Sequence, residues 1–268
     1  MQIIDGKALR DKLLANLAEE ISSKKLKPRL AIVLIGDDEA SLRYIKQKQK
    51  AAEEIGAQAQ LLQLPVGTAE ENLITKIEEL NANEEVTGII VQLPLPGNLD
   101  KEKILETIAK AKDVDGLRKD SAFEPATPLG ILEILHEYKV PLKDKVAVVI
   151  GQSHLVGAPL SEMLENEGAK VTRIDINTPL PIDSLVQQGD IVIAAVGKVN
   201  LVTASMVKEG VVVIDVGTNL DPETGKLVGD VAFDGVKDKV SLITPVPGGV
   251  GPMTVAMLMK NLVLAATN

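Results

Sequence analysis

The sequence predicts an α/β fold in which an N-terminal α/β domain is followed by a C-terminal doubly wound parallel sheet. Short apolar runs with the length of buried strands alternate along the chain with amphipathic segments of helical period. Glycine repeatedly follows the apolar runs of the second half, as in parallel sheets whose strand ends face a ligand. A length of 268 residues is also sufficient for two domains.

The composition argues against several classes of function. There are 29 basic and 38 acidic residues, a net charge of -9, so we expect neither nucleic acid nor a membrane surface as a partner. The chain has no cysteine, and its two histidines lack metal-ligand spacing, so we expect no metal site. The N-terminus lacks a signal-peptide pattern, and no apolar run has the length of a membrane span. These features predict a cytoplasmic protein.

The first half of the chain has the alternating pattern of an α/β domain. Residues 5–23 have leucine and isoleucine at helical spacing, and residues 30–35 are a continuous apolar run that ends at Gly36. The elements expected after these are a helix at 40–55, a strand at 57–64, a helix at 69–81, a strand at 86–96 and a helix at 101–111.

Two polar residues lie on the apolar side of the helix expected at 40–55. A helical wheel places Tyr44 and Lys48, four residues apart, in the apolar arc next to Ser41. Burial disfavours an ammonium ion, so Lys48 is suited to exchange protons, and Tyr44 is placed to orient it or to stack on a flat ligand. The alternative is a lysine whose stem packs against the core while its ammonium group reaches solvent.

An amide and two carboxylates follow later elements of the first half. The strand at 86–96 carries Gln92 near its C-terminal end, where ligands of parallel sheets bind, although the Gln92 amide can also hydrogen-bond to the backbone alone. Asp113 and Asp115 lie in one turn, and a carboxylate there can shape or cap the turn instead of binding a ligand. We therefore expect Lys48, Gln92 and one aspartate to contribute to a site.

The second half opens with a helix-start signal, Thr127-Pro128. Residues 146–150 are a buried strand, and the glycines and serine that follow it form an incomplete version of the pattern that places phosphates at a helix N-terminus. A plain strand-to-helix turn is the alternative. The expected elements after this strand are a helix at 159–167, strands at 170–174, 191–196, 211–216 and 241–243, a loop of prolines and glycines at 245–252, and a C-terminal helix.

Six signatures occur in a fixed order along the chain. They are ASLRYIKQK at 40–48, GIIVQLPLP at 88–96, KDVDG at 112–116, TP at 127–128, GQSHLVGAP at 151–159 and PVPGGVGPMT at 245–254. In these segments the sequence resembles, over essentially its full length, the bifunctional methylenetetrahydrofolate dehydrogenase/methenyltetrahydrofolate cyclohydrolase family. The resemblance implies that NADP or NAD oxidises 5,10-methylenetetrahydrofolate, that the methenyl product is hydrolysed to 10-formyltetrahydrofolate, and that the protein is a homodimer.

The same resemblance implies a division of the chain and roles for its residues. Residues 1–120 would form the folate-binding catalytic domain with the helix at 254–268 packed back on it, residues 121–253 would form a Rossmann-type dinucleotide domain, and a cleft would lie between them. Lys48 would be the general acid/base, tuned by Gln92, with Tyr44 positioning the folate and Asp115 binding the pterin. Other residues expected to line the folate site are Ser41, Val91, Leu93, Pro247, Gly248, Gly249 and Gly251. Residues expected to bind the dinucleotide are Gly151, Gln152, Ser153, Val156, Gly157, Asp175, Gly197 and Thr218.

Two positions depart from the family pattern in a way that concerns the dinucleotide. Family members often carry arginine where Gln152 stands, and a histidine-serine pair where Asp175-Ile176 stands. A carboxylate at the end of the second strand of a dinucleotide domain binds the ribose 2′-hydroxyl and repels a 2′-phosphate. We therefore expect good use of NAD, although Arg173 could reach a 2′-phosphate.

Two other functions compete with this interpretation. One is a different two-domain dehydrogenase similar to shikimate dehydrogenase, which would need charged groups for a carboxylate substrate and a glycine-alanine nucleotide loop. The other is a nucleotide-binding sensor without catalytic activity, which would not need Lys48, Gln92 and Asp115 together.

Overall fold

The computed structural model describes residues 1–222 and 224–267, which form two compact units. The six-stranded unit consists of Met1–Arg10 and Thr127–Thr254, and the three-stranded unit of Asp11–Ala126 and the segment from Val255 onward. The expected division placed the whole of residues 1–120 in one domain. The first ten residues instead belong to the six-stranded unit, because β1 (Gln2–Ile3) pairs there with β11 (Leu242–Ile243).

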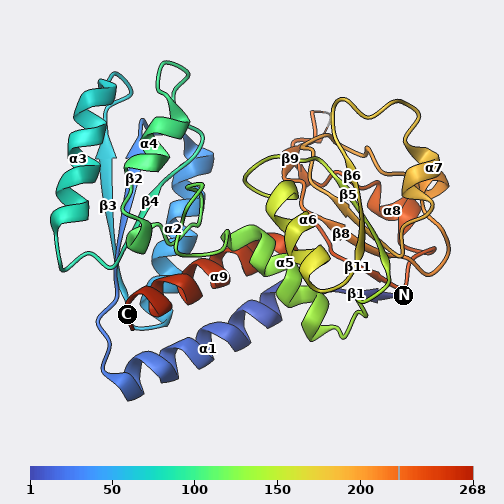
Figure 1. The fold of residues 1–268 in the computed structure, drawn as a ribbon, viewed down its shortest axis with the longest axis horizontal. Helices are drawn as coiled ribbons and strands as arrows, with labels where there is room; N and C mark the ends of the chain where they lie inside the picture. Colours follow the sequence, from blue (N-terminus) through green and yellow to red (C-terminus); the bar gives the residue numbers. More distant parts are fainter. Residues whose placement is uncertain (223, 268) are drawn as a thin grey trace. The chain divides into compact units, whose positions relative to one another are not determined.

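The sheet of the six-stranded unit is entirely parallel, with the order β1-β11-β8-β7-β5-β6. Figure 1 labels β1, β11, β8, β5 and β6 of this sheet. Its other strands are β5 (Val146–Ile150), β6 (Lys170–Ile174), β7 (Ile191–Ala194) and β8 (Val212–Asp215). The direction of strand addition reverses at β5, which has β6 on one side and β7 on the other. Ligands of doubly wound sheets bind at such a switch point, beyond the carboxyl ends of the strands.

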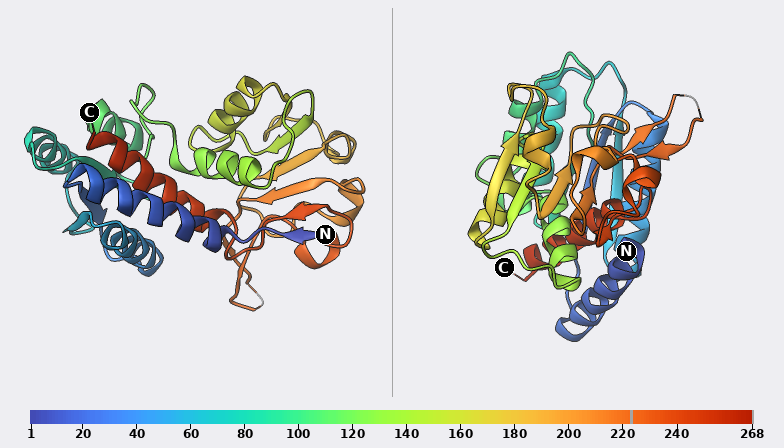
Figure 2. Two further views of the ribbon diagram at one scale, coloured as in Figure 1. Left: turned by 90° about the horizontal axis from the view of Figure 1, so that it is seen from below. Right: turned by 90° about the vertical axis from the view of Figure 1, so that its right-hand side faces the viewer.

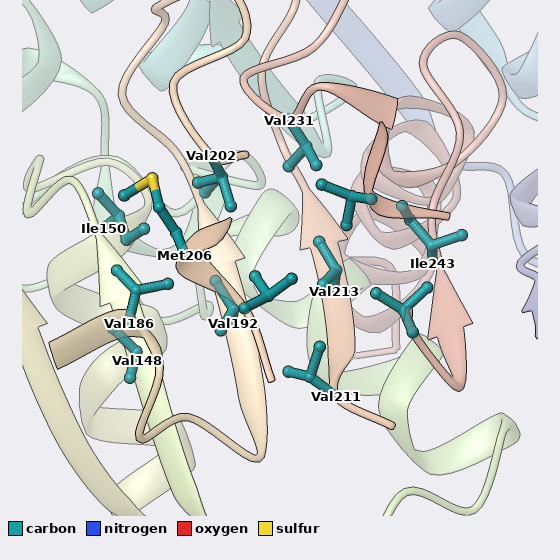
Figure 3. Close-up of a cluster of buried hydrophobic side chains, with 14 of the residues drawn as sticks. Val148, Ile150, Val186, Val192, Val202, Met206, Val211, Val213, Val231 and Ile243 are labelled. Atoms are coloured by element: carbon teal, nitrogen blue, oxygen red, sulfur yellow. The ribbon is translucent and has the colours of Figure 1, made fainter. Parts of the chain in front are cut away.

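One face of this sheet carries a core made almost entirely of valine and isoleucine (Figure 3). Three short helices close it: α7 (Asp183–Val186), η2 (Ala204–Met206) and α8 (Phe233–Val236), through Val186, Met206 and Val236. Right-handed crossovers place α6 (Gly157–Asn166), which packs on β5 and β6, on the opposite face. The hairpin of β9 (Asn219–Leu220) and β10 (Leu227–Val228) is separate from the main sheet (Figure 2).

The three-stranded unit has a parallel sheet with the order β3-β2-β4. Its strands are β2 (Arg29–Ile35), β3 (Gln58–Leu64) and β4 (Gly88–Val91). On one face, α3 (Glu70–Ala82) and α4 (Lys101–Thr107) pack against alternate residues of β2 and β4. The connection from β2 to β3 runs through α2 (Glu39–Glu54), which the right-handed crossover rule places on the other face. The other helices of the chain are α1 (Gly6–Lys24), η1 (Lys110–Lys112), α5 (Ala126–Glu137) and α9 (Val250–Ala265).

The predicted fold class is confirmed, and β5 and β6 have the predicted bounds. The helix expected at 159–167 begins two residues earlier, at Gly157, because glycine there packs directly on the preceding turn. The sequence did not reveal β1, β9, β10, α7 and α8, which are too short to show a period. Among residues 1–222 and 224–267, no helix combines the length and the hydropathy that a bilayer crossing requires.

Candidate active site

The end of β4 and the middle of α2 bring an amine and a carboxamide into contact. Lys48 Nζ donates a hydrogen bond to Gln92 Oε1 at 3.0 Å, although the two residues are 44 positions apart. Gln92 Nε2 donates to the carbonyl of Leu93 at 2.7 Å, and the Gln92 amide N–H donates to Val33 O at 2.8 Å. The carboxamide is therefore held in the orientation that presents its oxygen to the lysine.

The exposure of α2 residues differs from the wheel-based expectation. Ser41 is buried at 3% exposure, whereas Tyr44 is 39% exposed and Lys48 is half-buried. Ile45 occupies the centre of the buried stripe, so Tyr44 lies outside it instead of within the apolar arc. The helix starts at the cap Asp38, whose carboxylate accepts the Ser41 amide at 2.7 Å. That hydrogen bond lowers the pKa of Asp38.

The two aspartates of the KDVDG turn have different environments. Asp113 is 1% exposed and accepts the Arg118 amide at 2.9 Å, and burial raises the pKa of its carboxyl group. Asp115 is half-buried, and within the described ranges its carboxylate has no hydrogen-bond donor. Asp113 thus shapes the turn, which leaves Asp115 available for a ligand. Gly116, at φ +71°, permits the turn because a Cβ there would lie 2.6 Å from the Glu124 carbonyl carbon.

In the six-stranded unit, two glycines allow backbone segments to approach more closely than a side chain would permit. A Cβ on Gly157 would lie 1.7 Å from Gly151 O, and a Cβ on Gly151 would lie 2.2 Å from Ala195 O. The amides of Val156 and Ala158 donate to Ser153 O at 3.3 and 3.0 Å, so the turn closes directly into the ten-residue helix α6. A tight glycine turn that enters a helix N-terminus at the switch point fits the phosphates of a dinucleotide.

The cations and amides beside this turn already have partners. Gln152 Nε2 donates to Val149 O at 3.1 Å, and Ser161 Oγ donates to Gln152 Oε1 at 3.3 Å. The Arg173 guanidinium donates to both carboxylate oxygens of Glu165, at 2.6 and 2.9 Å.

Asp175 lies at the end of β6 with an exposed carboxylate. Its Oδ1 accepts the Asn177 amide at 2.8 Å, and this hydrogen bond lowers the pKa of Asp175, which is therefore an anion at neutral pH. Ile176, the next residue, is 99% exposed.

The proline- and glycine-rich loop expected at 245–252 belongs entirely to the six-stranded unit, and its last three residues form the first turn of α9. A Cβ on Gly6 would lie 1.8 Å from Gly249 O, so the loop packs against the start of α1. Gly248 has φ +104°, a conformation that L residues rarely adopt. Thr127 and Thr254 join α5 to α9 through a 3.1 Å hydrogen bond between their hydroxyls. Residues 247–249 thus form a defined loop within their own unit, and Gly251 lies in the first turn of α9.

Sequence reasoning did not identify two buried carboxylates of the six-stranded unit. Asp215 is 4% and Asp230 0% exposed, and both accept several hydrogen bonds. Asp215 also lines a cavity of about 310 Å³, together with Asn200, Phe233, Asp234 and Val246. The available signal was an aspartate inside the apolar run 211–216.

The six-stranded unit is a doubly wound sheet whose glycine turn at 151–157 fits phosphates. The same chain presents the Lys48 amine, held by the Gln92 carboxamide. Together these features are those of a dinucleotide-dependent enzyme with acid-base chemistry. Family models identify it further. Residues 4–115 match the tetrahydrofolate dehydrogenase/cyclohydrolase catalytic domain, and residues 125–268 match the NAD(P)-binding domain of the same family. The chain belongs to the tetrahydrofolate dehydrogenase/cyclohydrolase family, as its motifs predicted.

Relatives resemble the chain over its whole length. The bifunctional protein FolD of Nautilia profundicola is 45% identical over 280 residues, which cover 100% of this chain and 98% of that protein. The crystal structure of the FolD enzyme from Campylobacter jejuni has a TM-score of 0.96 and 44% identity, covering 100% and 99% of the two chains. That of Trypanosoma brucei FolD, complexed with NADP and an inhibitor, has a TM-score of 0.94 and 36% identity, covering 99% and 97%.

Shikimate dehydrogenase, the rival enzyme, shares only the fold. The Thermus thermophilus enzyme is 17% identical with a TM-score of 0.54. The predicted function is confirmed by family membership: the protein is an enzyme of folate one-carbon metabolism that oxidises methylenetetrahydrofolate with a nicotinamide dinucleotide and hydrolyses the methenyl product.

Proposed function

We propose that Lys48 is the general acid/base of methenyl hydrolysis, with Gln92 holding its amine, Tyr44 positioning the folate and Asp115 binding the pterin. The observation that carries this proposal is the 3.0 Å hydrogen bond from Lys48 Nζ to Gln92 Oε1. Among the described residues, no carboxylate forms an ion pair with Lys48, so its amine is free to exchange protons with a ligand. The half-buried carboxylate of Asp115 is likewise free to accept pterin N–H groups.

The positive charge of the methenyl intermediate determines which form of the Lys48 amine takes part in hydrolysis. The dinucleotide, when bound, accepts a hydride, and the folate then carries a methenyl cation delocalised over two nitrogens. A second cation beside it is unfavourable, so the uncharged form of Lys48 accepts the proton of the attacking water. The same nitrogen returns a proton to the ring nitrogen as its bond to carbon breaks, and the hydroxyl proton leaves as the formyl carbonyl forms.

The variant Lys48→Met tests this role. We expect methenyl hydrolysis to fall by about 10²- to 10⁴-fold, the usual contribution of a positioned acid/base, while the circular dichroism spectrum and the unfolding midpoint remain those of the wild type. Lys46→Met is the matched control, because Lys46 is an exposed lysine on the same helix. The measurement is the decay of methenyl absorbance, and undiminished decay in the Lys48 variant would remove this residue from the mechanism.

We also propose that the turn at 151–157 binds the dinucleotide phosphates through the backbone of Gly151, Ser153, Val156 and Gly157. In the same proposal, Asp175 binds the adenosine ribose, and Gly197 and Thr218 line the nicotinamide end. The support is the glycine packing at the switch point and the position of Asp175 beyond β6.

We propose further that the enzyme prefers NAD to NADP. Asp175 is anionic, Gln152 carries no charge, and the Arg173 guanidinium is engaged by Glu165, so the 2′-phosphate of NADP would meet repulsion without a cation to offset it. Initial rates of methenyl formation with each dinucleotide test this preference. Asp175→Ser should reduce the ratio of the rate with NAD to the rate with NADP. A tenfold or greater preference of the wild type for NADP would contradict the proposal.

Resemblance to the family is the basis for a further proposal, that the protein is a cytoplasmic homodimer. Light scattering that returned the monomer mass of 28.5 kDa at micromolar concentration would contradict the dimer.

A further inference from the structure

Two buried carboxylates of the six-stranded unit have no part in the chemistry described above. Asp215 ends β8, and Asp230 follows β10 after one residue. Both are almost completely inaccessible, at 4% and 0% exposure. Burying a carboxylate is costly unless hydrogen bonds replace its hydration, so the donors around these groups indicate what the carboxylates hold in place.

Asp230 binds the loop that follows β7. Its Oδ2 accepts the backbone amides of Val196 at 2.6 Å and Gly197 at 2.9 Å. Its Oδ1 accepts the Lys198 amide at 2.8 Å and Asn219 Nδ2 at 2.9 Å. Three consecutive backbone amides therefore converge on one carboxylate, which fixes the path of residues 196–198.

Asp215 in turn fixes Asp230. Its Oδ1 accepts the amides of Gly217 and Asp230, both at 2.9 Å, and its Oδ2 accepts the Val231 amide at 2.9 Å. The neighbouring Val231 is anchored in the apolar core and forms a bridge with Val202 (Figure 3). The position of Asp230 is thus set by β8 and by the core.

Glycines make room for this pair. A Cβ on Gly217 would lie 2.2 Å from Asp230 Oδ1, and a Cβ on Gly229 would lie 1.8 Å from Asp215 Oδ2. Both glycines therefore serve the buried carboxylates, and this explains glycine at these positions without a direct contact with a ligand.

The loop that Asp230 holds, residues 196–198, lies beside the switch point of the sheet. A Cβ on Gly151 would lie 2.2 Å from Ala195 O and 3.3 Å from the Val196 side chain, so the loop after β7 packs directly against the turn after β5. Doubly wound sheets bind dinucleotides between these two connections. Any shift of residues 196–198 would therefore change the shape of the dinucleotide site.

We propose that Asp230 is a positioning residue for dinucleotide binding, supported by Asp215, and that it acts by holding residues 196–198 against the phosphate turn. The proposal rests on the proposed location of the dinucleotide at residues 151–157 and Gly197. Asp230 acts through the loop and takes no part in proton or hydride transfer.

The variant Asp230→Asn provides the test. All four donors around Asp230 are N–H groups, and a carboxamide has only one acceptor oxygen, so its NH₂ group must face donors and displace the loop. We expect the KM for NAD to rise at least tenfold, while the KM for methylenetetrahydrofolate and the rate of methenyl hydrolysis without dinucleotide stay within twofold of the wild type. Hydrolysis needs no redox partner and therefore reports whether the protein is folded.

Asp190→Asn is the matched control. Asp190 also accepts a backbone amide, that of Val146 at 2.9 Å, and an amine, that of Lys208 at 2.7 Å, but it precedes β7 at the amino edge of the same sheet. This variant should keep the wild-type KM for NAD. An unchanged KM for NAD in Asp230→Asn, or an equal loss of hydrolysis and dinucleotide binding, would overturn the proposal.

Hydrogen exchange of the unmodified protein tests the same inference if Asp230→Asn does not fold. The amides of residues 196–198 should exchange slowly, and saturating NAD should slow them further; exchange that NAD leaves unchanged would overturn the proposal. A wild type that forms no methenyl product and binds no dinucleotide would instead contradict the proposed function, so the two failures are distinguishable.

Discussion

Two lysines of the family signatures differ in how far their hydrogen-bonding capacity is used within the protein. Lys112 Nζ donates to three carbonyls at the end of α3, those of Leu80, Asn81 and Asn83, at 3.2, 2.8 and 2.7 Å. Desolvation lowers the pKa of Lys112, but its protons are committed to the backbone. The amine of Lys48 has a single carboxamide oxygen as its partner and retains capacity for a ligand.

Asp215 predicts a pH dependence of stability. Burial, together with the nearby charge of Asp230, raises the pKa of Asp215 to about 6, against 3.8 for an exposed aspartate. The folded protein therefore keeps a proton on Asp215 that the unfolded chain releases between these values. The contribution of this proton to the free energy of unfolding is fully present below about pH 4. It is lost as the pH rises through 6, a change of about 3 kcal/mol.

Urea unfolding of the wild type and Asp215→Asn between pH 4.5 and 7.5 measures this effect. The free energy of unfolding of the wild type should fall relative to that of the variant as the pH rises, because the carboxamide does not titrate. Exposed carboxylates with lowered pKa values, such as Glu165 and Asp175, titrate below this range. Parallel pH profiles of the two proteins would show that Asp215 titrates in the same way in the folded and unfolded states.

At the scale of elements, α9 holds the turn that carries Asp115. Asn261, at 4% exposure, donates through Nδ2 to Val114 O at 2.9 Å and to Glu124 O at 3.0 Å. The two carbonyls belong to the segments around Val114 and Glu124, which can approach each other because Gly116 has no side chain. A single side chain thus fixes both sides of the turn.

The variant Asn261→Ala should lower the free energy of unfolding by about 2–4 kcal/mol, because two buried carbonyls lose their donor. Leu264→Ala, on the same helix at 50% exposure, is the control and should cost less than about 1 kcal/mol. Chemical denaturation measures both values. Similar losses in the two variants would show that the Asn261 hydrogen bonds contribute little.

The sequence predicted long elements better than short ones. The apolar runs of β5 and β6 have sharp ends, because glycine or a charged residue follows them. The hydrogen bond between Lys48 and Gln92 matches the expected pairing of an α2 residue with the end of β4. Asp230 was missed because its partners are backbone amides more than thirty residues earlier in the chain, and no residue pattern encodes such donors.

At the scale of the whole molecule, the order of strands was beyond the reach of sequence patterns. A periodic pattern identifies a strand but carries no information about its neighbours, so the position of β5 between β6 and β7 came from the structure. The grouping of the first ten residues with the six-stranded unit was not predicted for the same reason, since it depends on which strand β1 pairs with. Lys48, Gln92 and Asp115 lie in one unit and the glycine turn at 151–157 in the other, so the proposed roles of the two groups can be tested by separate substitutions.

Pairing of β1 with β11 joins Gln2 and Ile3 to a segment 240 positions later in the chain. During synthesis on the ribosome, Gln2 and Ile3 have no strand to pair with until Leu242 and Ile243 have emerged from the exit tunnel. The three-stranded unit has all its strands translated by residue 91, whereas this edge can form only after residue 243 has been translated. The edge of the larger sheet that contains β1 therefore forms only after the strands of the smaller sheet have all been synthesised.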